Sequence, residues 1–176
     1  AGLIQFVVKN ATVPVIETGA GICHLYVDKD ADLNKALTIA VNAKIQRPSV
    51  CNAIETILVH KDVADKFLPE LKKAFEKVEI KGDDATCQII HCEHVTDDSY
   101  ATEYDDYIVN IRVVDSVEEA INHIYTYSTK HSESIITEND ETAVLFMNSL
   151  DSACVYHNAS TRFSDGGEFG FGAELG

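Results

Sequence analysis

Apolar residues along this chain follow two alternating spacings. In some segments, short runs of apolar and β-branched residues are bounded by glycine, aspartate or other polar residues, which is typical of strands. In the others, apolar residues recur every three or four positions, which predicts amphipathic helices. The predicted strands cover residues 3–8, 13–16, 22–27, 56–60, 87–91, 107–114, 134–137 and 153–158. The predicted helices cover residues 33–44, 63–75, 117–127 and 141–150.

Strands that alternate with helices at this spacing favour an α/β fold. Neighbouring parallel strands need a crossover connection, and a helix usually supplies it. We therefore expect a three-layer αβα sandwich around a largely parallel sheet. Asp28 or Asp30 is expected to cap the first of these helices, and Asp115 with Ser116 to open the helix at residues 117–127. Pro69 lies inside the second helical pattern, where we expect a kink or a break into two short helices.

The negative charge of the chain argues against nucleic acid as a partner. Its formal net charge is −15, with 29 acidic and 14 basic residues, and such a field repels nucleic acid. No apolar run reaches the roughly 18 residues that a membrane span needs, and no signal-like pattern opens the chain. We therefore expect a cytoplasmic protein with no nucleic-acid or membrane partner. The five cysteines form no disulfide-scaffold spacing, and we expect them to be reduced.

One cysteine stands out by its position. Cys51 follows Pro48, between the first predicted helix and the strand at residues 56–60. Pro48 should end that helix, and the turn after it can begin a new helical turn with the thiol near its amino end. Free N–H groups and the helix dipole would favour the thiolate there. A thiolate beside backbone donors can attack a carbonyl and stabilise the oxyanion that forms.

The chain lacks the usual dinucleotide-binding motif. Gly-x-Gly-x-x-Gly between a strand and a helix would hold a pyrophosphate at the helix amino end. Gly19 and Gly21 follow a predicted strand but lead into another strand. We therefore do not expect this chain to bind a dinucleotide by itself.

Several motifs together resemble one enzyme family. They occur at residues 17–28 (ETGAGICHLYVD), 42–52 (NAKIQRPSVCN), 103–106 (EYxD), 131–137 (HSExIxT) and 158–167 (NASTRFSDGG). In order and spacing they resemble the gamma-glutamyl phosphate reductases, also called glutamate-5-semialdehyde dehydrogenases, of the aldehyde dehydrogenase superfamily. The resemblance spans essentially the whole chain. It implies the fold of an aldehyde dehydrogenase catalytic domain.

The resemblance also implies a domain division and an activity. Residues 1–19 would be remnant strands of a dinucleotide-binding domain, and residues 20–176 the catalytic domain. The implied reaction is the NADPH-dependent reduction of L-glutamyl 5-phosphate to glutamate 5-semialdehyde in proline biosynthesis, through a cysteine thioester. A glutamate 5-kinase would be functionally coupled to it, and a homo-oligomer is possible. The alternatives are another member of the superfamily and a catalytically silent isolated domain.

By the same resemblance, Cys51 is the nucleophile. Glu17 falls where the oxidising members of the superfamily carry a general base, although a base that activates water would hydrolyse the thioester of a reductase. Glu103 aligns with a glutamate that contacts a cofactor ribose, but Tyr104 and Asp105 replace the aromatic and glycine residues that usually follow it. Gly19 is expected on the cofactor side.

The expected substrate contacts lie near both ends of the catalytic domain. Arg47 and Arg162 are candidate anchors for the anionic substrate, because a guanidinium group grips a carboxylate or phosphate at two points. Asn158, Ser160 and Thr161 follow the strand at residues 153–158, and sites of α/β proteins usually form at strand carboxyl ends. Ordinary turn and cap roles are the alternative for these three polar residues.

A group of cysteines and histidines has the residue types of a zinc site. It consists of Cys87, His91, Cys92 and His94. In a strand, Cys87 and His91 would face one side, and Cys92 and His94 the other. We therefore expect no metal.

Overall fold

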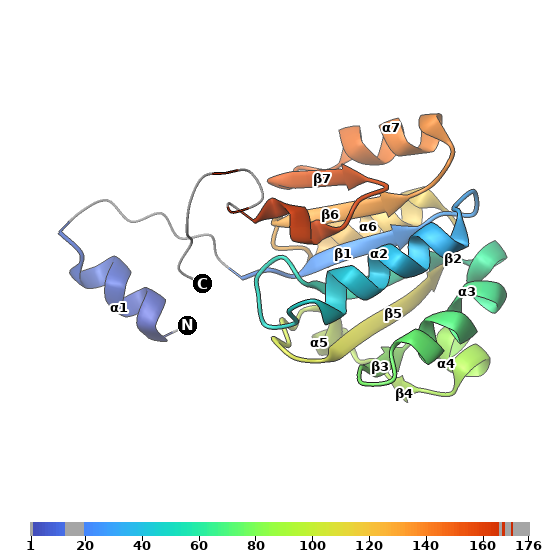
Figure 1. Ribbon diagram of the computed structural model, residues 1–176, viewed down its shortest axis with the longest axis horizontal. Helices are drawn as coiled ribbons and strands as arrows, with labels where there is room; N and C mark the ends of the chain where they lie inside the picture. The colour runs from blue at the N-terminus through green and yellow to red at the C-terminus, as the bar shows by residue number, and fades with distance from the viewer. Residues whose placement is uncertain (1, 13–19, 166, 168–169, 171–176) are drawn as a thin grey trace.

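The computed structural model describes residues 2–12, 20–165, 167 and 170. A seven-stranded sheet with the order β4-β3-β5-β2-β1-β6-β7 forms its centre (Figure 1). Every neighbouring pair of these strands is parallel. The strands are β1 (Cys23–Val27), β2 (Ile54–His60), β3 (Glu79–Gly82), β4 (Glu93–His94), β5 (Ile108–Val114), β6 (Ser132–Ile136) and β7 (Cys154–His157).

Helices cover both faces of the sheet, so the expected three-layer α/β fold is confirmed. The helices are α1 (Gly2–Asn10), α2 (Leu33–Ile45), α3 (Lys61–Ala74), α4 (Asp84–Ile90), α5 (Asp97–Tyr100), α6 (Val117–Tyr127) and α7 (Asp140–Ser149), with a 3₁₀ turn η1 (Thr161–Ser164). Helices α2, α3 and α4 pack with alternate strand residues such as Leu25, Ile57 and Ile111. Helices α6 and α7 pack with the opposite set, which includes Tyr26 and Leu58.

The segment at residues 3–8 is helical, so the prediction of a strand there is wrong. Helix α1 ends with Ala11 N–H donating to Val7 O at 2.8 Å, and the Phe6 side chain is 63% exposed. Figure 1 draws α1 beside the sheet rather than in it. A β-branched run can form a helix when no strand pairs with it, because a helix satisfies its own backbone groups. The predicted strand at residues 13–16 lies outside the described residues.

Residues 87–90 also belong to a helix, α4, and residue 91 follows its end, which corrects a second predicted strand. Asp83 caps α4 by accepting from Thr86 N–H at 2.9 Å. This short apolar run is compatible with either structure, and periodicity alone does not separate the two.

Two details of the helices correct the predictions. Pro69 lies within a single helix, α3, so the expected break into two short helices is wrong. Residues on both sides of the proline, Phe67, Leu68 and Leu71, are fully buried, and this apolar face holds the helix together. Asp32, rather than Asp28 or Asp30, caps α2 by accepting from Asn34 N–H at 2.9 Å.

Ser116 caps α6 as predicted, by accepting from Glu119 N–H at 3.3 Å. Among the helices of the described residues, none is both long and apolar enough to cross a membrane.

The chain segments that enter β1 and β2 approach very closely. A Cβ atom added to Gly21 would lie 1.6 Å from the carbonyl oxygen of Cys51 and 2.7 Å from its Cα. Both atoms belong to the backbone, so they cannot move aside as a side-chain end would. Glycine at position 21 therefore allows the Cys51 turn to lie directly against the start of β1.

A buried ion pair joins α2 to β2. Lys44 Nζ lies 3.0 Å from Glu55 Oε2, and the two side chains are 0% and 1% exposed. Burial raises the pKa of Glu55 to about 7, although Lys44 opposes the shift. Burial likewise lowers the pKa of Lys44, against the attraction of Glu55. The pair fixes α2 to the strand that follows the Cys51 turn.

We expect Gly21→Ala to lower the free energy of unfolding by about 1–3 kcal/mol, because the added methyl group overlaps the Cys51 backbone. Urea denaturation measures the change. Gly167→Ala is the matched control, because its added Cβ would lie 3.1 Å from Asp165 Oδ1, which can move. Equal stabilities of the wild type and Gly21→Ala would show that the two backbones do not approach this closely.

We expect Lys44→Met to cost about 3–5 kcal/mol, because it leaves the Glu55 carboxyl buried without its cation. The double variant Lys44→Met/Glu55→Leu should recover most of that loss. Because the pKa of Glu55 is raised in the folded state, its contribution to the free energy of unfolding is fully present below the unfolded pKa. That contribution is lost as the pH rises through the folded pKa. Urea denaturation at pH 5 and pH 8 should therefore find Lys44→Met weaker at pH 8, and the double variant less sensitive to pH.

Candidate active site

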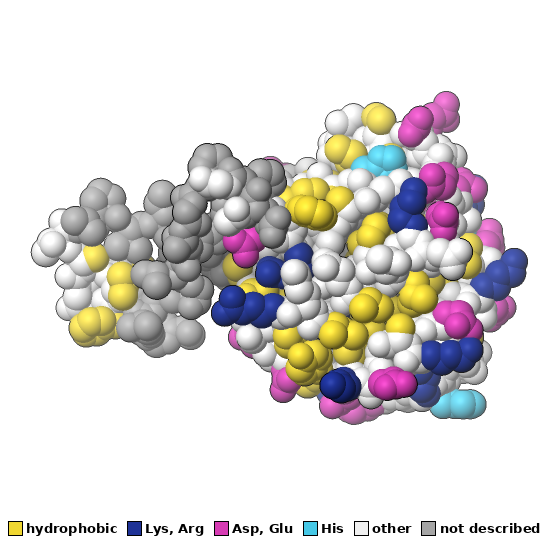
Figure 2. Space-filling view, in the orientation of Figure 1, with side chains coloured by type: hydrophobic (Ala, Val, Ile, Leu, Met, Phe, Trp, Pro, Cys, Tyr) yellow, Lys and Arg dark blue, Asp and Glu magenta, His cyan; other side chains and the backbone are white. Residues whose placement is uncertain are grey.

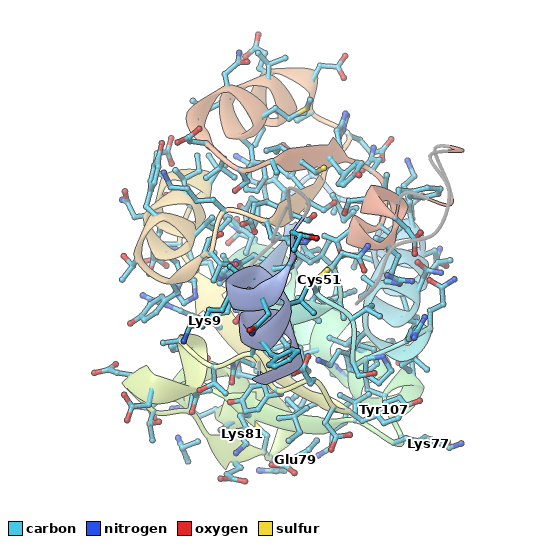
Figure 3. All side chains as sticks on the ribbon, turned by 90° about the vertical axis from the view of Figure 1, so that its left-hand side faces the viewer. Lys9, Cys51, Lys77, Glu79, Lys81 and Tyr107 are labelled. Atoms are coloured by element: carbon cyan, nitrogen blue, oxygen red, sulfur yellow. The ribbon has the colours of Figure 1, made fainter. Side chains whose placement is uncertain are left out.

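Cys51 lies in a turn at the amino end of β2. Ala53 N–H donates to Val50 O at 2.9 Å, so Cys51 and Asn52 occupy the two central positions of this turn. No helix begins there, which corrects the expected helix amino end and removes the helix dipole from the argument. Cys51 is half-buried, and Figure 3 shows it on the side of the molecule where the strands begin.

The candidate site therefore lies at the amino edge of the sheet, not at the carboxyl edge that the sequence predicted. Cys51 precedes β2, and Gly21 precedes β1. After β7 the chain turns back, and η1 packs against β6, β7 and α2. This return brings the segment after β7 to the Cys51 turn.

Asn52 connects the Cys51 turn to η1. Its backbone carbonyl accepts from Thr161 Oγ1 at 2.7 Å, and its side-chain Nδ2 donates to Arg162 O at 3.5 Å. Arg162 Nη1 donates in turn to Asn52 Oδ1. Asn52 is 3% exposed, so these contacts are shielded from water. We call this set of contacts between Asn52, Thr161 and Arg162 the Asn52 clamp.

Sequence reasoning missed the role of Asn52, although the residue lies inside a quoted motif. The signal was its place directly after the cysteine, where a short amide side chain can bond in two directions.

The two candidate substrate arginines differ in their surroundings. Arg162 is engaged by the protein: its Nε donates to Gln46 Oε1 at 3.1 Å, and its Nη2 lies 3.8 Å from Asp165 Oδ2. Arg47 is exposed and has no hydrogen-bond or ion-pair partner among the described residues. Figure 2 shows some Lys and Arg side chains at the left of the α/β body, the side on which the strands begin, and others at its right and lower edges.

The three polar candidates after β7 lie in different places. Thr161 is fully buried in the Asn52 clamp, and Ser160 caps η1 by accepting from Arg162 N–H at 3.2 Å. Asn158 lies at the carboxyl edge, where its Oδ1 accepts from Thr137 N–H at 3.1 Å. It adopts a left-handed conformation with φ 53°. The structure thus brings Ser160, Thr161 and Arg162 toward Cys51, but places Asn158 about one strand length away.

Glu103 lies against the segment that enters β1. Its Oε1 accepts from Gly21 N–H at 2.7 Å, so the carboxylate is close to the Cys51 backbone that Gly21 contacts. The other two residues predicted near the cofactor, Glu17 and Gly19, lie outside the described residues.

A second thiol, that of Cys23, contacts the Cys51 turn. Cys23 Sγ donates to the Cys51 carbonyl oxygen at 3.2 Å, and Cys23 is fully buried. Burial, reinforced by the charge of Glu133, raises the pKa of Cys23 well above its ordinary value. Cys23 is therefore a protonated donor to the turn rather than a second nucleophile.

The cysteine-histidine group of Cys87, His91, Cys92 and His94 does not share the faces of one strand, because Cys87 lies in α4. Within the described part of the chain, no three His, Cys, Asp or Glu side chains are arranged to hold a metal ion.

The chain is similar to known proteins in both sequence and fold. The gamma-glutamyl phosphate reductase of Limosilactobacillus reuteri is 58% identical over 177 residues, which cover 99% of this chain and 43% of that protein. The enzyme of that name from Petrotoga mobilis is 60% identical over 176 residues, which cover 99% of this chain and 42% of that protein. The chain thus spans less than half the length of these relatives.

A crystal structure of the gamma-glutamyl phosphate reductase from Thermotoga maritima has the same fold. It matches with a TM-score of 0.91 at 54% identity, over 99% of this chain and 43% of that one. The family model described as "Aldehyde dehydrogenase family" matches residues 5–103, which is more than half of the chain. This chain belongs to the aldehyde dehydrogenase family.

Proposed function

We propose that this chain is the catalytic part of a gamma-glutamyl phosphate reductase. The similarity to relatives of that name along 99% of the chain supports the proposal most directly. The parent protein would reduce L-glutamyl 5-phosphate to L-glutamate 5-semialdehyde with NADPH, in the cytoplasm. A glutamate kinase reaction would supply the acyl phosphate, since phosphorylation activates the carboxyl group.

In this proposal Cys51 forms the covalent intermediate. Its thiolate attacks the acyl carbon, a carbon–sulfur bond forms, and the carbon–oxygen bond to phosphate breaks. The product of that step is a thioester on Cys51, and the phosphate leaves with the electron pair. The turn orients the sulfur, because the Gly21 contact and the Asn52 clamp hold the backbone on both sides of it.

A reductase must also keep water from the thioester. This requirement limits Glu17, which at the position of a general base would promote hydrolysis. We therefore propose that Glu17 orients the nucleophile or the nicotinamide side of the cofactor, and does not activate water.

NADPH, when bound, supplies the hydride that reduces the acyl carbon. The described residues fit only the periphery of such a cofactor, because Glu103 has one oxygen directed to Gly21 N–H and a second for a ribose hydroxyl. Gly19 lies two residues before Gly21 and is proposed beside the nicotinamide. We propose that residues 1–19 belong to the dinucleotide-binding part and that residues 20–176 form the catalytic part.

Two arginines would bind the anionic substrate in different ways. Arg47 is exposed and has no protein partner among the described residues, so its guanidinium group can form a two-point contact with a carboxylate or phosphate. Gln46 and Asn52 bind Nε and Nη1 of Arg162. The remaining nitrogen, Nη2, lies near Asp165 and is the atom that would contact a substrate. Ser160 would line the same edge of the sheet beside them.

We expect Cys51→Ser to reduce turnover of the full-length protein by at least about 1,000-fold, because serine is a much weaker nucleophile at neutral pH. Phosphate-dependent reduction of NADP by glutamate semialdehyde measures the reaction in reverse. Cys154→Ser is the matched control, because Cys154 is half-buried and begins β7, which β1 and β6 separate from β2 in the sheet. Thermal unfolding should show that both variants fold.

The same assay separates the alternatives. NADP reduction that needs no phosphate would indicate another member of the family. Turnover retained by Cys51→Ser would remove Cys51 from the chemistry. A purified 176-residue chain that binds no NADPH in titration would be silent by itself, which agrees with a cofactor site formed mainly by other parts of the protein.

We expect Arg47→Gln to raise the KM for the glutamyl substrate about tenfold or more with little change in kcat, because it removes a contact made to the bound substrate. Arg162→Gln should lower kcat as well, since it also opens the Asn52 clamp. Arg162→Lys should not restore kcat, because an ammonium group cannot bond Gln46 and Asn52 in the fork geometry. Steady-state kinetics of the full-length variants would test this, and an unaltered KM in Arg47→Gln would rule out that anchor.

A further inference from the structure

The end of α4 brings two cysteines together. His91, the residue after α4, has φ 48°, and its N–H donates to Cys87 O at 3.0 Å. This left-handed helix stop turns the chain back, so that the residue after it lies against the last helical turn. In many helices two apolar side chains meet at such a stop. Here the two residues are Cys87 and Cys92.

The two thiols are in direct contact. Cys87 Sγ lies 2.6 Å from Cys92 Sγ, and it also contacts the carbonyl oxygens of Gly82 at 3.4 Å and Cys92 at 3.3 Å. A Cβ atom added to Gly82 would lie 2.6 Å from Cys92 Sγ, so only glycine at position 82 leaves room for this arrangement. Cys87 is buried and Cys92 is half-buried, so Cys92 is the more exposed residue of the pair.

We propose that Cys87 and Cys92 are a redox-sensitive dithiol that exchanges with low-molecular-weight disulfides to form a disulfide within the chain. The site is separate from Cys51 and is independent of the proposed reductase activity. Its oxidised form would bind the end of α4 covalently to the start of β4.

The exchange is balanced in two steps. The Cys92 thiolate attacks one sulfur of the external disulfide, which forms a mixed disulfide and releases one thiolate. Cys87, after losing its proton, attacks Cys92 Sγ and displaces the second thiolate. The two protein thiols are oxidised, the external disulfide is reduced to two thiols, and the two protons end on them.

The surroundings set the rate of this exchange. Burial and the hydrogen bond to Cys87 raise the pKa of Cys92, while the nearby Lys72 ammonium group opposes the shift. Lys72 Nζ donates to the His91 carbonyl at 3.0 Å, which keeps its charge beside the pair. The thiol form of Cys92 predominates at neutral pH, so the first step is slow. The second step is fast, because the attacking thiol is already in contact with its target.

Peptide mapping of the wild-type chain tests the proposal. The protein is incubated with oxidised glutathione, free thiols are then blocked with N-ethylmaleimide, and trypsin is added without reductant. The peptide of residues 82–112 contains Cys87 and Cys92 and no other cysteine. We expect this peptide to lose two hydrogen atoms, with the internal disulfide exceeding its glutathione adduct by about tenfold or more.

Two outcomes would overturn the proposal. In one, residues 82–112 carry two maleimide groups after Cys51 has reacted with glutathione, so that the two thiols only fill space at the helix end. In the other, glutathione stays on Cys92 and Cys87 never displaces it. Both outcomes are measured on the wild-type protein, so neither requires that a variant fold.

Variants then assign the bond. Cys92→Ser should abolish the loss of two hydrogen atoms, whereas the matched control Cys154→Ser should retain it. Repeating the oxidation in urea should remove the tenfold preference, because the αL turn that holds the thiols together is lost. An unchanged preference in urea would mean that closeness in sequence alone, and not the fold, pairs the two cysteines.

Discussion

The contact between the Gly21 backbone and the Cys51 carbonyl determines where the Cys51 turn lies. A parallel sheet leaves the start of each strand connected to a helix on one of its faces, so its amino edge is crowded with entering chain segments. At this edge two segments meet with no side chain between them. The turn is therefore supported by backbone on one side, and its position follows from the pairing of β1 with β2.

The opposite side of the turn is held by side chains from a distant part of the chain. Asn52 bonds Thr161 and Arg162 through its backbone and its amide group, and Gln46 holds the remaining side of the Arg162 guanidinium. Two different restraints, steric and polar, thus act on adjacent residues. Such restraint is what nucleophilic catalysis requires, because the reacting atom must be oriented before the substrate arrives.

The sequence predicted the architecture well where amphipathic periods were long. The helix at residues 117–127 and the strand at residues 107–114 were recognised because each has a clear period and, for the helix, a serine cap. Residues 3–8 and 87–91 were misread as strands because short apolar runs fit both structures, and the partners that decide between them are remote in sequence.

The candidate site was predicted in part. Position and chemistry singled out Cys51, Arg47 and Arg162 directly. The edge of the sheet was misjudged, because the rule for α/β proteins points to carboxyl ends, and nothing local in residues 158–164 shows that η1 returns to the other edge. The dual bonding of Asn52 was missed for the same reason, since both of its partners lie about 110 residues away.

That separation has a consequence for how the protein matures on the ribosome. The bond between Arg162 and Asn52 spans 110 positions, and η1 is the last regular element of the described chain. A nascent chain that has emerged only as far as β6 already carries Cys51 but has no Asn52 clamp. Long-range closures of this kind form late in folding. The Cys51 turn is therefore completed only after all seven described strands have been translated, so a chain truncated before η1 retains the sulfur without the Asn52 clamp.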